Sequence, residues 1–104
     1  MKDKLLKIIE HYELLTQLKY IHTEYYELDE AILEYYNDTI NYYPEVEKCH
    51  VNHIAEEIAD VMVILKQFQH YFGISDLDIQ KNMEYKINRQ LERIEKEENV
   101  SSRN

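Results

Sequence analysis

Two pairs of carboxylates with the same spacing are the residues of this sequence that most directly suggest chemistry. Glu24 and Glu27 form the first pair, and Glu57 and Asp60 form the second. Residues three apart lie on one side of an α-helix, so each pair projects as a unit if its segment is helical. The second pair lies in an apolar run, where an unpaired charge is costly to bury. We therefore expect these carboxylates to pair with cations or to bind a metal.

A metal site follows if the two segments pack antiparallel. Four carboxylates would then converge and repel one another unless cations neutralise them. Hard oxygen ligands suit Mg²⁺, with Mn²⁺ as an alternative. Neither pair carries the histidine that is typical of Glu-x-x-His di-iron bundles. The predicted metal ligands are Glu24, Glu27, Glu57 and Asp60. The competing interpretation is that these acids lie on solvated helix faces, as most Glu-x-x-Glu pairs in acidic proteins do.

Positive charge recurs on one face of the last predicted helix. Asn82, Lys86, Arg89 and Arg93 follow one another at i, i+4, i+7 and i+11. Three cations and an amide on one face are suited to bind phosphate. Pairing with neighbouring acids would explain the same face, and a salt bridge from Lys86 or Arg89 would explain Asp60 without a metal.

The composition predicts a small helical protein. The chain has 104 residues, one Gly and one Pro, and 44% hydrophobic residues, which favours long helices with few turns. Its net charge of −9 argues against non-specific nucleic-acid binding, which needs a basic surface. A single cysteine, Cys49, fits a reducing compartment. No apolar run approaches the roughly 18 residues of a membrane span. We expect a cytoplasmic protein that binds neither membranes nor nucleic-acid polymers.

Helical spacing of apolar residues defines the elements that must position the acids. Residues 3–37 predict one long helix, or two joined by a kink within residues 13–19. A loop of about ten residues is expected after the helix ends near Asn37, with a short helical turn starting at Pro44. The signals are the side chains of Asn37, Asp38 and Thr39, which compete for backbone hydrogen bonds, and the position of Tyr42 and Tyr43 before Pro44. The turn at Pro44 runs into a third helix, whose predicted buried stripe is Ile54, Ile58, Val61, Leu65, Phe68 and Phe72.

The end of the chain predicts one more helix. Gly73 is suited to end the third helix, and Ser75 is suited to cap the start of the fourth. The apolar stripe of the fourth helix is Ile79, Met83, Ile87, Leu91 and Ile94. We predict an all-α antiparallel bundle of about four helices in a single domain, residues 1–97, that oligomerises through helix faces. Residues 98–104 are expected to form a disordered tail.

Three elements of the sequence together resemble a protein family. TEYYEL at 23–28 and EEIADV at 56–61 match a pattern of Glu-Glu-x-x-Glu followed downstream by Glu-x-x-Asp, except that Thr23 replaces the leading Glu. The spacing of Asn82, Lys86 and Arg89 looks like the Lys/Arg segment on the family's last helix. The chain thus resembles the MazG-like all-α nucleoside triphosphate pyrophosphohydrolases, which are related to phosphoribosyl-ATP pyrophosphohydrolases and dimeric dUTPases.

This resemblance implies an activity and an assembly. It implies a Mg²⁺-dependent hydrolase that cleaves a nucleoside triphosphate between the α- and β-phosphates, giving a nucleoside monophosphate and pyrophosphate. The catalytic metal ligands would be Glu24, Glu27, Glu57 and Asp60, and the substrate would be bound by Asn82, Lys86 and Arg89. The subunits would form a homodimer or a homotetramer. The alternative is a non-catalytic helical module that uses the same scaffold for nucleotide binding or protein interaction.

Overall fold

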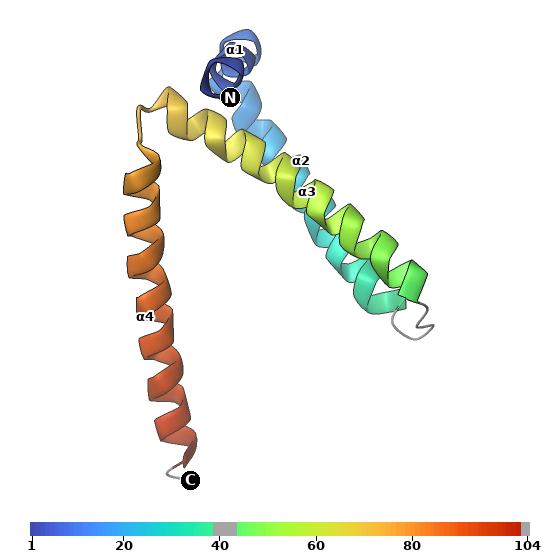
Figure 1. Ribbon diagram of the computed structural model, residues 1–104, viewed down its shortest axis with the longest axis vertical. Coiled ribbons are helices and arrows are strands. Elements are labelled where there is room, and N and C mark those ends of the chain that lie inside the picture. Colours follow the sequence, from blue (N-terminus) through green and yellow to red (C-terminus); the bar gives the residue numbers. More distant parts are fainter. Residues whose placement is uncertain (39–43, 103–104) are drawn as a thin grey trace. The chain divides into compact units, whose positions relative to one another are not determined.

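The computed structural model describes residues 1–38 and 44–102, which consist of helices and the short connections between them (Figure 1). The helices are α1 (Lys2–Tyr12), α2 (Leu14–Asp38), α3 (Pro44–Tyr71) and α4 (Asp76–Ser102). The all-α prediction is therefore confirmed. None of the described helices is both long and apolar enough to cross a membrane. The chain divides into two compact units, one with α1 to α3, residues 1–72, and one from Gly73 onward that contains α4.

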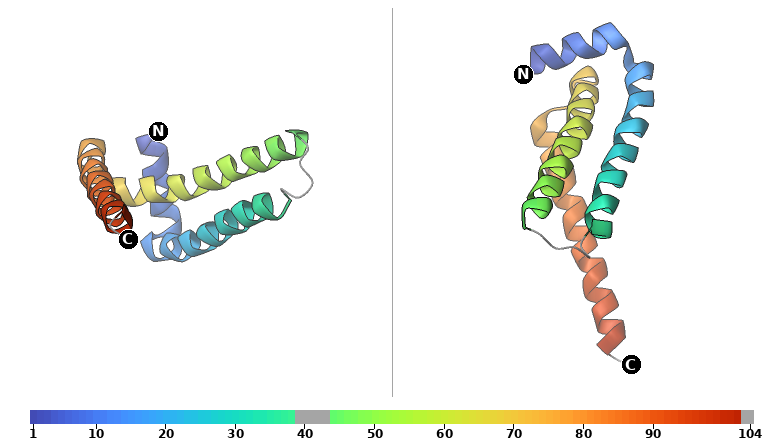
Figure 2. Two further views of the ribbon diagram at one scale, coloured as in Figure 1. Left: turned by 90° about the horizontal axis from the view of Figure 1, so that it is seen from below. Right: turned by 90° about the vertical axis from the view of Figure 1, so that its right-hand side faces the viewer.

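The first unit is an antiparallel pair of long helices, α2 and α3, with the short helix α1 across one end (Figure 2). Of the two alternatives for residues 3–37, the structure has two helices rather than one. The break is at Glu13, whose φ of 64° is unusual for a residue with a side chain. The carbonyl of Glu13 accepts the first hydrogen bond of α2, from the amide of Gln17 at 3.2 Å.

The connection between α2 and α3 is shorter than the sequence predicts. Helix α2 continues through Asp38, and α3 begins at Pro44, so the expected ten-residue loop is wrong. Proline is well suited to the first position of a helix, where its missing N–H is not needed. Thr39, Tyr42 and Tyr43, which favoured a loop, lie outside the described residues. Beyond the connection, Nε2 of His50 on α3 lies 2.9 Å from Oδ2 of Asp38 on α2.

The core of this unit is small and is interrupted by polar residues. Its buried apolar side chains are Leu5, Ile9, Ile21, Ala31, Val61 and Ile64. The buried stripe predicted for α3 is partly wrong, because Ile58 and Leu65 are each 43% exposed and Phe72 is 62% exposed. The helix instead turns Val61, Ile64 and Gln67 inward, at intervals of three residues.

The helix α4 forms the second unit, and its start agrees with the sequence. Gly73 has a φ of 68°, the left-handed conformation that glycine adopts without strain. The hydroxyl of Ser75 accepts a hydrogen bond from the amide of Asp78 at 3.1 Å, as a helix cap does. The helix continues to Ser102, past the predicted end near Glu97. Its apolar stripe is largely exposed, with Met83 at 57% and Leu91 at 57%.

Candidate metal centre

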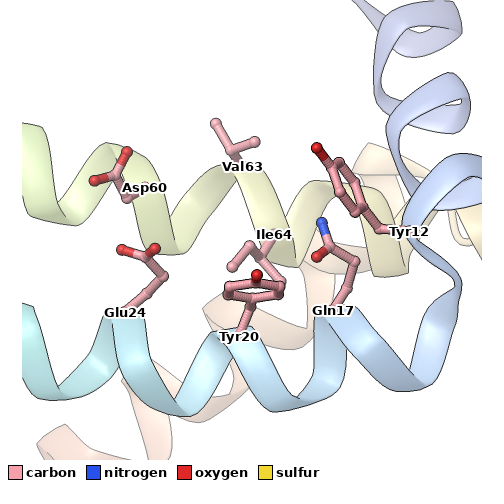
Figure 3. Close-up of a pocket in the computed structure, with 7 residues that line it drawn as sticks. All are labelled: Tyr12, Gln17, Tyr20, Glu24, Asp60, Val63 and Ile64. Atoms are coloured by element: carbon pink, nitrogen blue, oxygen red, sulfur yellow. The ribbon is translucent and has the colours of Figure 1, made fainter.

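The antiparallel pairing of α2 and α3 brings the two acidic pairs together. Each of the four residues offers one carboxylate oxygen, and these four atoms all lie within 4.8 Å of one another. The residues are Glu24 and Glu27 on α2 with Glu57 and Asp60 on α3, which we call the acidic cluster. Glu24 and Asp60 face each other across the two helices (Figure 3). The residues proposed from the sequence as one metal site thus share one place in the fold.

Two carboxylate oxygens of the acidic cluster are buried without a partner. Oε2 of Glu24 and Oε2 of Glu57 have almost no accessible surface and accept no hydrogen bond from the residues that the structure describes. The Glu57 side chain is only 13% exposed, and its Oε1 lies 3.9 Å from Nε2 of His53. Buried polar atoms almost always have a partner, because desolvation without compensation is costly. The two oxygens therefore indicate that something outside the chain, a cation or a proton, completes this site.

The raised pKa values of two carboxyl groups in the acidic cluster also indicate that a cation or a proton completes the site. Burial raises the pKa of Glu24, and repulsion from Glu27 and Asp60 raises it further. Burial also raises the pKa of Glu57, again with repulsion from Glu27 and Asp60, whereas nearby His53 lowers it. A raised carboxyl pKa means that the site disfavours its fully charged state. A bound divalent cation would reverse that preference.

The donor set of the acidic cluster fits a hard divalent cation. All four candidate ligands are carboxylates, and no histidine or cysteine joins them within the described part of the chain. Mg²⁺ and Mn²⁺ prefer such oxygen ligands, whereas structural zinc sites draw on cysteine and histidine. Cys49 is an exposed free thiol and is not a member of the cluster.

A pocket of about 310 Å³ adjoins the acidic cluster (Figure 3). Its lining includes Glu24 and Asp60 at one end and Gln17 at the other. In Figure 3, Tyr20 lies on α2 between Glu24 and Gln17, and Tyr12 lies at the Gln17 end. The helical patterns of the sequence did not predict this pocket. One signal was available, because Gln17 lies seven residues before Glu24, two helical turns away on the same face of α2.

The cationic residues lie in the second unit. Lys86 and Arg89, together with Gln90 and Arg93, line a shallow hollow of about 140 Å³ on α4. Asn82 is engaged within the helix, since its Nδ2 donates to the carbonyl of Asp78 at 2.8 Å. Substrate binding by Asn82, Lys86 and Arg89 stays a prediction.

Comparisons with known proteins add no relative. No family model matches this sequence, and searches of the curated proteins and of the solved structures find no match.

Proposed function

We propose that this protein is a Mg²⁺-dependent nucleoside triphosphate pyrophosphohydrolase of the MazG-like type. It would cleave a ribo- or deoxyribonucleoside triphosphate between the α- and β-phosphates and release a nucleoside monophosphate and pyrophosphate. The resemblance of TEYYEL at 23–28 and EEIADV at 56–61 to the family's acidic motifs suggests this reaction. The single exposed cysteine, Cys49, is consistent with a reducing, cytoplasmic location.

One observation carries the proposal: four carboxylate oxygens lie within 4.8 Å of one another, and two residues of this group each have a buried oxygen without a partner. A solvated acidic helix face would leave its oxygens in water, so it does not explain them. An isolated carboxylate would not be buried in this way unless its charge were compensated. A site that takes up a divalent cation supplies that compensation.

The residues of the acidic cluster have distinct places in this proposal. The cation would be held by the carboxylates of Glu24, Glu27, Glu57 and Asp60. Mg²⁺ bound there would neutralise phosphate charge and lower the pKa of a coordinated water. Glu24 or Glu27 would orient the attacking water by accepting its hydrogen bond. Because the catalytic contribution is mainly positioning and charge neutralisation, the separation of the four carboxylates decides the activity.

The helix α4 would serve substrate binding and assembly. Asn82, Lys86 and Arg89 would hold phosphates or ribose, and the hollow lined by Lys86 and Arg89 offers positive charge for this role. The exposed apolar stripe of α4 favours a homodimer or homotetramer, since a lone amphipathic helix cannot bury its own stripe.

The direct test is product analysis. The full chain is incubated with a panel of nucleoside triphosphates, with Mg²⁺ or with EDTA, and the products are separated by anion-exchange chromatography. We expect a nucleoside monophosphate and pyrophosphate to appear only with Mg²⁺. Release of a nucleoside diphosphate and orthophosphate, or turnover that is the same in EDTA, would contradict the proposal.

A second candidate is a non-catalytic helical module, and the exposure of the α4 stripe favours it. Met83, Ile87 and Leu91 are each more than half exposed, as expected for a surface that binds another protein. Such a module would tolerate alanine at all four positions of the acidic cluster. It would also show no rise in melting temperature with Mg²⁺ and nucleotide.

A further inference from the structure

We propose that the pocket beside the acidic cluster is a nucleobase subsite, in which the amide of Gln17, held in place by Gln67, hydrogen-bonds the edge of the base. The inference rests on the proposed function, since it assumes that the acidic cluster receives phosphate through a cation. It identifies the residues that would recognise the base of the nucleotide.

The geometry of the two helices gives the pocket two chemically different ends. On α2, Gln17 precedes Glu24 by seven residues, and on α3, Gln67 follows Asp60 by seven residues. Because the helices are antiparallel, the two glutamines meet at one end and the two acids at the other. Seven residues of α-helix span about 10 Å. The pocket therefore suits an elongated ligand with a neutral hydrogen-bonding group at one end and a cation-bridged anion at the other.

The neutral end is a buried and oriented amide. Gln17 is 7% exposed and Gln67 is 1% exposed. Nε2 of Gln17 donates to Oε1 of Gln67 at 2.8 Å, which fixes the orientation of the Gln17 amide. This bond uses one N–H of Gln17 and leaves Oε1 and the second N–H for a ligand. In Figure 3 the Gln17 oxygen lies on the side of Tyr20.

An amide with one donor and one acceptor side by side matches the edge of a nucleobase. Asparagine and glutamine form such paired hydrogen bonds with adenine, and the other bases also carry an adjacent donor and acceptor. A ligand that lacked these groups would leave a buried amide unpaired, which makes the site selective.

The wall of the pocket suits a flat ring. Tyr12 and Tyr20 are 50% and 51% exposed, so their aromatic surface is available to a ligand. The Tyr20 ring lies between α2 and α3 beside Ile64 (Figure 3). Stacking of a base on an aromatic side chain contributes about 1–3 kcal/mol and tolerates different bases. No residue that lines the pocket is positively charged, so the pocket itself favours the base over the phosphates.

The test compares ligands that share a phosphate and differ in the base. Isothermal titration calorimetry in Mg²⁺ measures the affinity of the full chain for ribose 5-phosphate and for the 5′-monophosphates of adenosine, cytidine, guanosine and uridine. We expect at least one monophosphate to bind about tenfold tighter than ribose 5-phosphate, since stacking and the paired hydrogen bonds both contribute. Equal affinity for all five ligands would overturn the inference.

The decisive variant is Gln17→Met/Gln67→Met. Replacing both amides by apolar side chains of similar shape avoids leaving one buried polar group alone, so this variant should fold with a melting temperature close to that of the wild type. We expect it to lose the selectivity among the four monophosphates, which depends on the amides, and to keep the part of the affinity that comes from stacking on Tyr20, while its affinity for ribose 5-phosphate stays unchanged. A double variant that keeps the full preference for the base would overturn the inference.

The single variant Gln67→Met tests whether Gln67 is a positioning residue. It leaves the Gln17 amide present but free to rotate, so selectivity among the four monophosphates should fall while the affinity for ribose 5-phosphate stays the same. A purely structural role of Gln67 would instead lower the affinity for all ligands together, and this result would contradict positioning.

A matched pair of tyrosine variants isolates stacking. Tyr20 and Tyr25 lie on α2 with exposures of 51% and 52%, but only Tyr20 lines the pocket. We expect Tyr20→Leu to weaken binding of the preferred monophosphate about tenfold, whereas Tyr25→Leu should leave it unchanged. Equal effects of the two variants would count against the subsite.

Failure of the inference and failure of the proposed function are separable, because binding and turnover are measured independently. Selectivity among the monophosphates that the double glutamine variant loses supports the subsite even if no triphosphate is cleaved. Conversely, Mg²⁺-dependent release of pyrophosphate by a protein whose binding ignores the base and both glutamines would support the activity and overturn the subsite.

Discussion

The interface between α2 and α3 contains two polar interruptions, and they differ in how their burial is compensated. Gln17 and Gln67 hydrogen-bond each other at 2.8 Å, so the chain itself supplies the partner. Glu24 lies two helical turns from Gln17, and Glu57 lies nearly three turns from Gln67. Each of the two acids buries an oxygen that has no hydrogen-bond partner among the described residues. Two amides can satisfy each other because an amide is both donor and acceptor, whereas ionised carboxylates only accept. The acidic cluster therefore depends on a cation or a proton, and the glutamine pair does not.

The largest effect that this comparison predicts is loss of turnover on removal of one cluster charge. Glu57→Gln keeps the shape of the side chain but removes a proposed cation ligand, and we expect Mg²⁺-dependent release of pyrophosphate to fall at least about 100-fold. Helical circular dichroism should stay unchanged. The matched control is Glu56→Gln, which changes the neighbouring exposed acid outside the cluster and should keep wild-type turnover. Equal activity of the two variants would argue against the proposed site.

The next effect is stabilisation by Mg²⁺. A ligand that binds only the folded state adds about 2.7 kcal/mol to the free energy of unfolding when its concentration is 100 times its Kd. We expect Mg²⁺ to raise the melting temperature of the wild type, as measured by differential scanning fluorimetry. The rise should vanish in Glu57→Gln and persist in Gln17→Met/Gln67→Met, because only the acidic cluster needs the cation. A rise of the same size in all three proteins would place the cation elsewhere.

The glutamine pair predicts a smaller effect, on stability alone. Gln67→Met leaves the buried Gln17 amide without its partner, at a cost of about 1–3 kcal/mol in the free energy of unfolding. Changing both residues to Met should restore most of this loss. Urea denaturation of the wild type, both single variants and the double variant forms a complete double-mutant cycle. Additive effects of the two single changes would show that the two amides do not compensate each other.

The smallest predicted effect is the pH dependence of stability without metal. The pKa values of Glu24 and Glu57 are raised above the ordinary 4.5, so between the unfolded and folded values the folded chain binds more protons than the unfolded chain. Their protonation stabilises the fold below about pH 4.5, and this contribution is lost as the pH rises through the folded pKa values. In EDTA, the melting temperature of the wild type should therefore fall below that of Glu57→Gln as the pH rises above 4.5. A gap that stays constant with pH would contradict this.

Much of the candidate site could be predicted from local sequence. The i, i+3 spacing places Glu24 beside Glu27 and Glu57 beside Asp60 on any helix, whatever the tertiary structure. The caps of α3 and α4 were also readable, because Gly73 and Ser75 act through their own backbone and side chain. These features depend on interactions between residues that are close in the sequence, so they can be predicted without the tertiary structure.

The features that the sequence did not predict depend on which faces of the helices meet. Helix α3 buries Gln67 at 1% exposure and leaves Leu65 43% exposed, an order that hydrophobicity alone would reverse. Glutamine is usually a surface residue, and the burial of Gln17 depends on its hydrogen bond with Gln67, which lies fifty positions later in the chain. The position of the break at Glu13 could not be predicted, because no glycine or proline lies near it in the sequence.

The sequence by itself determined the all-α class, the caps at Gly73 and Ser75 and the pairing of acids within each helix, because these depend on interactions within a few residues. Only the tertiary structure decided that the two acidic pairs converge within 4.8 Å, that two of their residues each bury an unpartnered oxygen, and that a pocket with an amide at its far end adjoins them. The physical reason is that convergence and burial depend on the rotation and register of one helix against another. Many weak contacts along the whole interface set that rotation and register together.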